Sequence, residues 1–201
     1  MQKIIYKFGS RYVLGLLIAA MSVFTAVSSY QNVTLDSKAN DTFSRAQEKL
    51  AFADSEYLSS TQEIMQDQNL YHGFSIALLK NEKDIADYYR SNFSDELQNS
   101  ITRPNGPFDA EYYNTMVADA ESGTDEALQL FTKANATSDA ADCYAQTMLI
   151  FSVGLTLTAW GSLFEKNAEL CAIFCIVAFG LLIFGAVVFF RIPFFTWMVP
   201  N

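Results

Sequence analysis

Three long uncharged stretches constrain the fold of this chain more than any other feature. Residues 12–30, 145–164 and 170–190 contain no Asp, Glu, Lys, Arg or His. A helix needs about 20 apolar residues to cross the hydrocarbon core of a bilayer. We therefore predict an all-α membrane protein in which each stretch is a transmembrane helix and the lipid bilayer is the first partner.

The segment between the first two stretches is polar and acidic. Residues 31–144 carry 20 acidic and 8 basic side chains, whereas the rest of the chain has 2 acidic and 5 basic ones. This partition excludes a wholly soluble domain and a nucleic-acid binder with a basic face. Three cysteines are too few for a disulfide framework.

The charges near the first stretch predict the orientation. Lys3, Lys7 and Arg11 precede it, and basic residues favour the cytoplasmic side. Arg191 runs mildly against this orientation. We expect an integral protein of a cell or inner membrane with this order: 1–11 cytoplasmic, 12–30 transmembrane, 31–144 extracytoplasmic, 145–164 transmembrane, 165–169 a cytoplasmic turn, 170–190 transmembrane, 191–201 an interfacial tail.

An alternative for the first stretch is a cleaved signal peptide. The same three basic residues precede an apolar core, and Ala26-Val27-Ser28 resembles a small-residue cleavage site. The apolar stretch continues nearly to Tyr30, which favours a retained anchor.

The polar segment contains large apolar residues at an unbroken spacing of seven. Alanines at positions 39, 46 and 53 occupy the alternate positions, which become polar further along, as at Ser60 and Asp67. This spacing predicts an extended antiparallel helical or coiled-coil domain. The helix-packing seam is Phe43, Leu50, Tyr57, Ile64, Tyr71, Leu78 and Ile85.

Breaker residues predict where these helices end. No glycine lies between Gly15 and Gly73, so the first span should continue into a long outer helix that bends at His72-Gly73. Residues 103–107 contain two prolines and a glycine and should form a loop. After a short helix over 109–121, we expect Ser122-Gly123 to interrupt and Thr124 to begin the helix that leads into the second span.

No arrangement of residues points to catalysis, to a cofactor or to a metal. His72 is the only histidine, so a two-histidine metal site within one chain is excluded. The acidic residues fit a solvated surface better than a calcium site. Cys171 and Cys175 share a helix face and are expected to pack, whereas Cys143 is expected at the outer membrane surface.

The uncharged interiors of the spans make active transport unfavourable as an explanation. Gly154, Thr158 and Ser162 lie four residues apart on the second span, and such small-residue stripes favour membrane helix packing. Four glycosylation acceptor triplets, which begin at residues 32, 40, 92 and 135, fit an outside location for the polar segment.

Short motifs around the polar segment carry a resemblance. Residues 125–128, 133–136 and 138–142 run directly into the second span, and Lys38-Ala39-Asn40-Asp41 follows the first. This layout resembles uncharacterised prokaryotic membrane proteins with an N-terminal span, a helical outer domain and a C-terminal hairpin of two spans. The resemblance implies a fold and no activity.

These observations favour a membrane scaffold, an accessory subunit or an oligomer-forming protein that acts through helix–helix interaction, with its own copies or other membrane subunits as partners. The alternative is an oligomeric channel or sensor that is gated by the outer helices and lined by Ser, Thr and Gly of the second span. An enzyme is the third hypothesis, and we find no nucleophile or metal for it.

Overall fold

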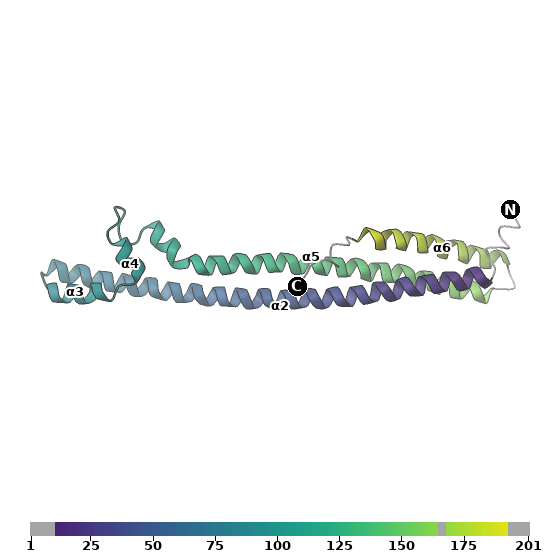
Figure 1. Ribbon diagram of the computed structural model, residues 1–201, viewed down its shortest axis with the longest axis horizontal. Helices are drawn as coiled ribbons and strands as arrows, with labels where there is room; N and C mark the ends of the chain where they lie inside the picture. The colour runs from purple at the N-terminus through teal and green to yellow at the C-terminus, as the bar shows by residue number, and fades with distance from the viewer. Residues whose placement is uncertain (1–10, 165–167, 193–201) are drawn as a thin grey trace. The chain divides into compact units, whose positions relative to one another are not determined.

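The computed structural model describes residues 11–164 and 168–192, which form helices and no strand (Figure 1). This confirms the predicted all-α class. The expected cytoplasmic N-terminus up to residue 10, residues 165–167 of the expected turn, and the expected interfacial tail from residue 193 lie outside the described residues. The helices are α2 (Arg11–Leu79), α3 (Lys83–Ser91), α4 (Asp95–Ser100), α5 (Ala110–Leu163) and α6 (Ala168–Arg191).

Three of these helices, α2, α5 and α6, contain segments long and apolar enough to cross a membrane, as the three uncharged stretches predict. The chain divides into two compact units. Met1–Thr42 and Thr132–Asn201 form the first, here called the apolar unit, and Phe43–Phe131 forms the second, here called the acidic unit. The acidic unit has 16 acidic and 6 basic side chains.

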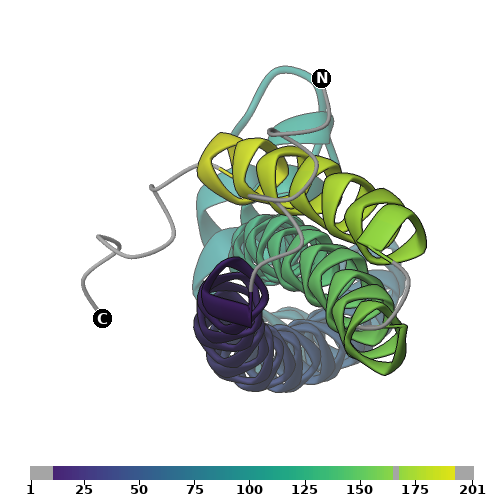
Figure 2. The ribbon, with the colours of Figure 1, turned by 90° about the vertical axis from the view of Figure 1, so that its right-hand side faces the viewer.

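In the apolar unit, the first part of α2, the last part of α5 and α6 pack side by side (Figure 2). Met21, Phe151 and Ala178 form a core cluster, one residue from each helix. A Cβ atom at Gly154 would lie 2.6 Å from Cε of Met21. Glycine at this position therefore lets the Met21 side chain rest directly on the backbone of α5.

In the acidic unit, α2 and α5 run antiparallel in close contact. The rings of Phe43 and Phe131 lie 5.1 Å apart, Lys49 Nζ lies 2.7 Å from Glu126 Oε2, and a Cβ at Gly123 would lie 3.1 Å from Cβ of Ala53. The middle of the contact consists of small side chains, because large ones would separate the backbones. The buried alanines along this part of the contact are Ala46, Ala53, Ala120 and Ala127.

The prediction that Ser122-Gly123 interrupts the return helix is wrong, because α5 runs unbroken from Ala110 to Leu163. A glycine inside a helix costs only about 1 kcal/mol relative to alanine, and here it permits contact with Ala53. Thr124 does not begin a helix. Its Oγ1 donates to the Ala120 carbonyl at 2.9 Å, as in the interior of a helix.

Helix α2 also continues through His72-Gly73, where we predicted a bend, and ends at Leu79. A Cβ at Gly73 would lie 2.6 Å from Cζ of Tyr89, so this glycine accommodates the ring of Tyr89 from α3. The helix ends in a Schellman motif, in which Asn81 has a φ of 57° and the Glu82 N–H donates to the Ala77 carbonyl at 2.9 Å. The predicted loop at residues 103–107 is confirmed.

Enlarging a buried alanine tests the close contact of α2 and α5. Ala127→Leu should lower the free energy of unfolding by about 1–3 kcal/mol, because Ala127 is fully buried and extra carbons overpack the contact. Ala118→Leu, on an exposed face of the same helix, should change it by no more than about 0.5 kcal/mol. Urea unfolding of the full chain in mild detergent, followed by circular dichroism, measures both. Equal effects would contradict the close contact.

Candidate functional site

The predicted helix-packing seam does not fill the middle of the α2–α5 contact, and it is interrupted before Ile85, which lies in α3 because α2 ends at Leu79. Ile64 and Tyr71 pack into a core cluster of the acidic unit, and Leu50 is half-buried. The remaining members, Phe43, Tyr57, Leu78 and Ile85, are exposed. Buried positions at the same spacing of seven are Ala46, Ala53 and Asp67. The coiled-coil character of this segment stays a prediction.

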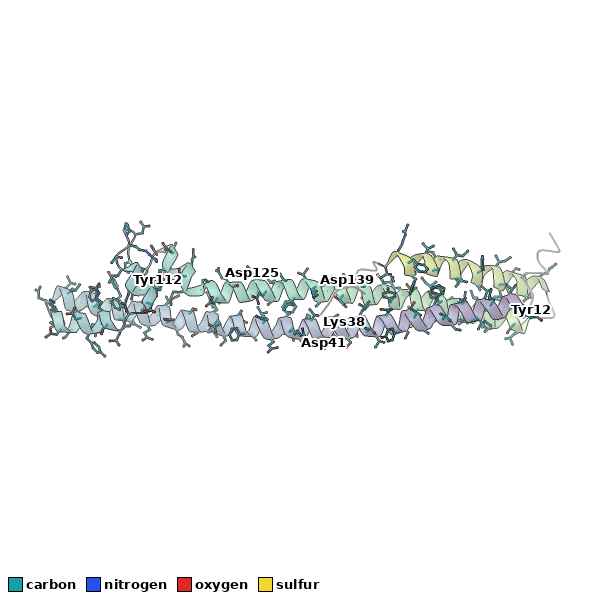
Figure 3. The ribbon with its side chains drawn as sticks, viewed as in Figure 1. Tyr12, Lys38, Asp41, Tyr112, Asp125 and Asp139 are labelled. Atoms are coloured by element: carbon teal, nitrogen blue, oxygen red, sulfur yellow. The ribbon has the colours of Figure 1, made fainter. Side chains whose placement is uncertain are left out.

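The cluster around Ile64 and Tyr71 is the main apolar core of the acidic unit. Phe93, Leu97 and Tyr112 are buried at its centre, and Phe108 packs its ring 5.2 Å from the ring of Tyr112. Figure 3 shows Tyr112 near the start of α5, beside α4. The cluster therefore joins α2, α4 and α5 across the loop that connects the last two.

A carboxylate lies inside this core. Asp67 of α2 is 1% exposed and accepts three hydrogen bonds: from the Ser94 N–H at 3.0 Å, from the Ser94 hydroxyl, and from the Tyr112 hydroxyl at 2.8 Å. Ser94 also caps α4, because its Oγ accepts from the Leu97 N–H. A buried carboxylate needs such partners, since an unpartnered one is strongly unfavourable. Burial and the hydrogen bond to Asp67 raise the pKa of Tyr112.

Charged side chains at the edge of the same core stabilise the beginning of α5. Asp109 accepts from the Tyr112 N–H at 2.9 Å, and the Arg103 guanidinium contacts Asp109 at 3.1 Å and Glu96 at 2.7 Å. The backbone N–H of Tyr112, together with Arg103, lowers the pKa of the Asp109 carboxyl. Arg103 therefore links the loop to α4 and to the first turn of α5.

The Asp67 network is enclosed, and its geometry suits support of the fold rather than chemistry. An open groove of about 460 Å³ lies on α2, but its lining does not include Asp67, Ser94 or Tyr112. Over residues 11–164 and 168–192, no group of three His, Cys, Asp or Glu side chains is placed to hold a metal ion. His72 is exposed on α2, and Cys143 is exposed on α5.

The predicted packing stripe of the second span is split. Gly154 and Thr158 are buried in the apolar unit, whereas Ser162 is exposed and donates to the Ala159 carbonyl at 2.7 Å. The residue before it, Gly161, is buried instead, and a Cβ there would lie 3.2 Å from Cβ of Phe174. Cys171 and Cys175 are buried against Leu14, as expected for packing residues.

The apolar unit buries a few polar side chains in its apolar core and exposes many large apolar ones. Ser28, Gln31, Thr147 and Thr158 are buried, and Asn32 Nδ2 donates to the Ala141 carbonyl at 2.9 Å. Large apolar side chains face outward on all three helices. They include Leu16, Val23, Leu149, Val153, Trp160, Ile176, Ile183 and Phe184.

Sequence reasoning missed the Asp67 network. The available signal was an acidic residue at a position where the first three repeats place alanine, and Ser94 ahead of Asp95 and Glu96, which is typical of a helix start. Neither signal indicates that the two residues meet, because 27 residues separate them.

Comparison of the chain with models of known protein families, with curated proteins and with solved structures finds no match.

Removal of one hydroxyl tests the Asp67 network. Tyr112→Phe should lower the free energy of unfolding by about 1.5–3 kcal/mol, because it removes a donor to a buried carboxylate. Tyr113→Phe is the matched control, since the Tyr113 hydroxyl accepts an exposed hydrogen bond from Gln68 Nε2 at 3.2 Å, and it should cost less than about 0.5 kcal/mol. Both are measured by urea unfolding. A Tyr112→Phe protein as stable as the control would contradict the network.

The lowered pKa of the Asp109 carboxyl predicts that its contribution to stability depends on pH. Its folded pKa lies below the unfolded value, so its ionised form stabilises the fold above that unfolded value, near pH 4, and the contribution is lost as the pH falls through the folded pKa. Asp109→Asn should therefore melt below the native protein at pH 7, and the gap should shrink by pH 3. Thermal melts at several pH values measure the gap, and a gap independent of pH would contradict this role.

Proposed function

We propose that this chain is an integral membrane protein with three spans that acts as a scaffold, accessory subunit or oligomer-forming protein through helix–helix interaction. In this proposal the spans 12–30, 145–164 and 170–190 of the apolar unit lie in the bilayer, residues 1–11 are cytoplasmic and residues 31–144 stand outside. The observation that carries it is the apolar surface of the apolar unit, on which large side chains such as Val153, Trp160 and Ile183 are exposed. Large apolar surface of this kind marks contact with lipid or with other proteins.

The character of the acidic unit supports the interaction role. Its buried groups form a packed core and an enclosed polar network, and its remaining features are helix surfaces. Functions that need a reactive group in an accessible cleft gain no support from this arrangement. The arrangement supports functions that need a rigid helical surface.

The channel or sensor alternative has less support. It requires the small and polar residues of the second span to face a pore between copies. Gly154 lies against Met21, and the Thr158 hydroxyl donates to the Leu155 carbonyl at 2.8 Å inside the unit. No specific observation favours this alternative over the scaffold.

The native cysteines test the topology. A membrane-impermeant maleimide should label Cys143 in intact cells, because this thiol is exposed and lies just before the second predicted span. Cys143→Ser should abolish the labelling, since Cys171 and Cys175 are buried in the apolar unit. Labelling only after the cells are permeabilised would contradict the orientation, and recovery of the protein in the soluble fraction would contradict membrane insertion.

The interaction role has its own measurement. Two differently tagged copies, or a tagged copy and other membrane proteins, should co-purify from mild detergent. A lone monomer that captures neither would contradict the proposal.

A further inference from the structure

Helix α2 carries a second stripe of residues at heptad spacing, on its solvent side in the acidic unit. Successive members follow at alternating steps of four and three residues, the spacing that lines one face of a coiled-coil helix. Every member is exposed: Leu58 is 63% exposed, Met65 58% and Leu79 84%. This outer stripe consists of Ala51, Ser55, Leu58, Gln62, Met65, Asn69, His72, Ile76 and Leu79.

The outer stripe avoids charge within a strongly acidic unit. The Asp, Glu, Lys and Arg residues of α2 between Ser55 and Leu79 are Glu56, Glu63 and Asp67, and none belongs to the stripe, whose one titratable member in this range is His72. From Ser59 to Ser75 the positions that flank the stripe are also uncharged, namely Ser59, Thr61, Gln66, Gln68, Gly73 and Ser75, and Asp54 flanks only its N-terminal end. Within this uncharged face Leu58, Met65 and Leu79 expose apolar side chains in line, which favours a surface that a partner covers.

The charge of the acidic unit indicates which partner covers the outer stripe. A basic partner would be attracted to the acidic faces of this unit, which has 16 acidic and 6 basic side chains, and not to an uncharged stripe. Two copies of the unit repel each other through those same acidic faces. The outer stripe is the face of α2 on which two copies approach without opposing like charges.

The chemistry of the stripe is also complementary to itself. Gln62 and Asn69 occupy one set of alternate positions, and each amide is both a donor and an acceptor, so it can pair with the same residue of a second copy. Leu58, Met65 and Leu79 occupy the other set and supply apolar contact. The open groove of about 460 Å³, lined in part by Met65, Asn69 and Tyr89, is a hollow beside the stripe that can receive a side chain of a second helix.

We propose that the outer stripe is the surface through which two copies of this chain associate, as a parallel, in-register coiled coil over residues 51–79. The inference rests on the proposed function, because copies that cross one membrane with one topology present α2 in the same direction. Polar residues such as Asn69 at core positions fix the register and reduce the affinity. Association through this surface therefore depends on the high local concentration that a shared membrane provides.

Cysteine cross-linking in native membranes tests the surface with the full chain. In a background with Cys143→Ser, Cys171→Ala and Cys175→Ala, single cysteines replace Leu58 or Met65 on the stripe, and Glu63 as the exposed control on another face of the same helix. After oxidation with copper phenanthroline, dimers should form at least about tenfold faster at positions 58 and 65 than at 63, because only stripe residues bring their Cβ atoms within disulfide reach.

A second set of variants tests the surface by placing a charge on the stripe. Met65→Lys, combined with Leu58→Cys, should slow cross-linking to the rate of the Glu63→Cys control, because it places two like charges in the contact. Glu63→Lys in the same background should leave the rate unchanged. Circular dichroism confirms that each variant keeps its helices.

The outcomes separate this inference from the proposed function. Cross-linking at position 63 as fast as at 58 and 65, or insensitivity to Met65→Lys, would overturn the outer stripe as the contact, and co-purification of tagged copies would then leave the proposed function standing. Failure of both cross-linking and co-purification would overturn both.

Discussion

The close approach of α2 and α5 is the constraint on which the rest of this structure depends. In each unit the two helices are antiparallel, and alanines at a spacing of seven lie buried along them: Ala39, Ala134 and Ala141 in the apolar unit, and Ala46, Ala53, Ala120 and Ala127 in the acidic unit. Small side chains let the two backbones come close, so many weak dispersion contacts accumulate along the pair. The other helices add to this pair, α6 in the apolar unit and α3 and α4 in the acidic unit.

A repeated alanine contact has an inherent weakness, because a slip of seven residues places alanine on alanine again. Single, unrepeated interactions remove this degeneracy. In the acidic unit Asp67 has its hydroxyl donors at Tyr112 and Ser94, and Gly123 faces Ala53. In the apolar unit Asn32 binds the Ala141 carbonyl and Met21 rests on Gly154. A slipped pairing of α2 and α5 takes the Tyr112 hydroxyl away from the buried Asp67 carboxylate, which is unfavourable. The exposed ion pair of Lys49 and Glu126 contributes little to this choice.

Local patterns in the sequence predicted the long helices and the loop correctly. The three uncharged stretches, the apolar periodicity, Pro104 and Pro107 each determine the structure of the residues next to them in the chain. The errors fall where the cause lies far away in the chain. Gly123 and Gly73 were interpreted as a break and a bend, whereas each accommodates a side chain of another helix, Ala53 and Tyr89. The heptad of large residues from Phe43 to Ile85 was prominent, but it does not reveal that alanines occupy the middle of the contact. The Asp67 network was missed for the same reason, because its partners are 27 and 45 residues away.

The register of α2 against α5 is tested most directly by an engineered disulfide in the full chain with its three native cysteines replaced. Ala53→Cys with Gly123→Cys should form an intramolecular disulfide under mild oxidation, because the Cβ positions lie 3.1 Å apart, close to the roughly 3.5–4.5 Å of natural disulfides. Ala46→Cys with Gly123→Cys, which reports a slip of seven residues, should remain reduced. A cross-link in the second pair and none in the first would contradict the account.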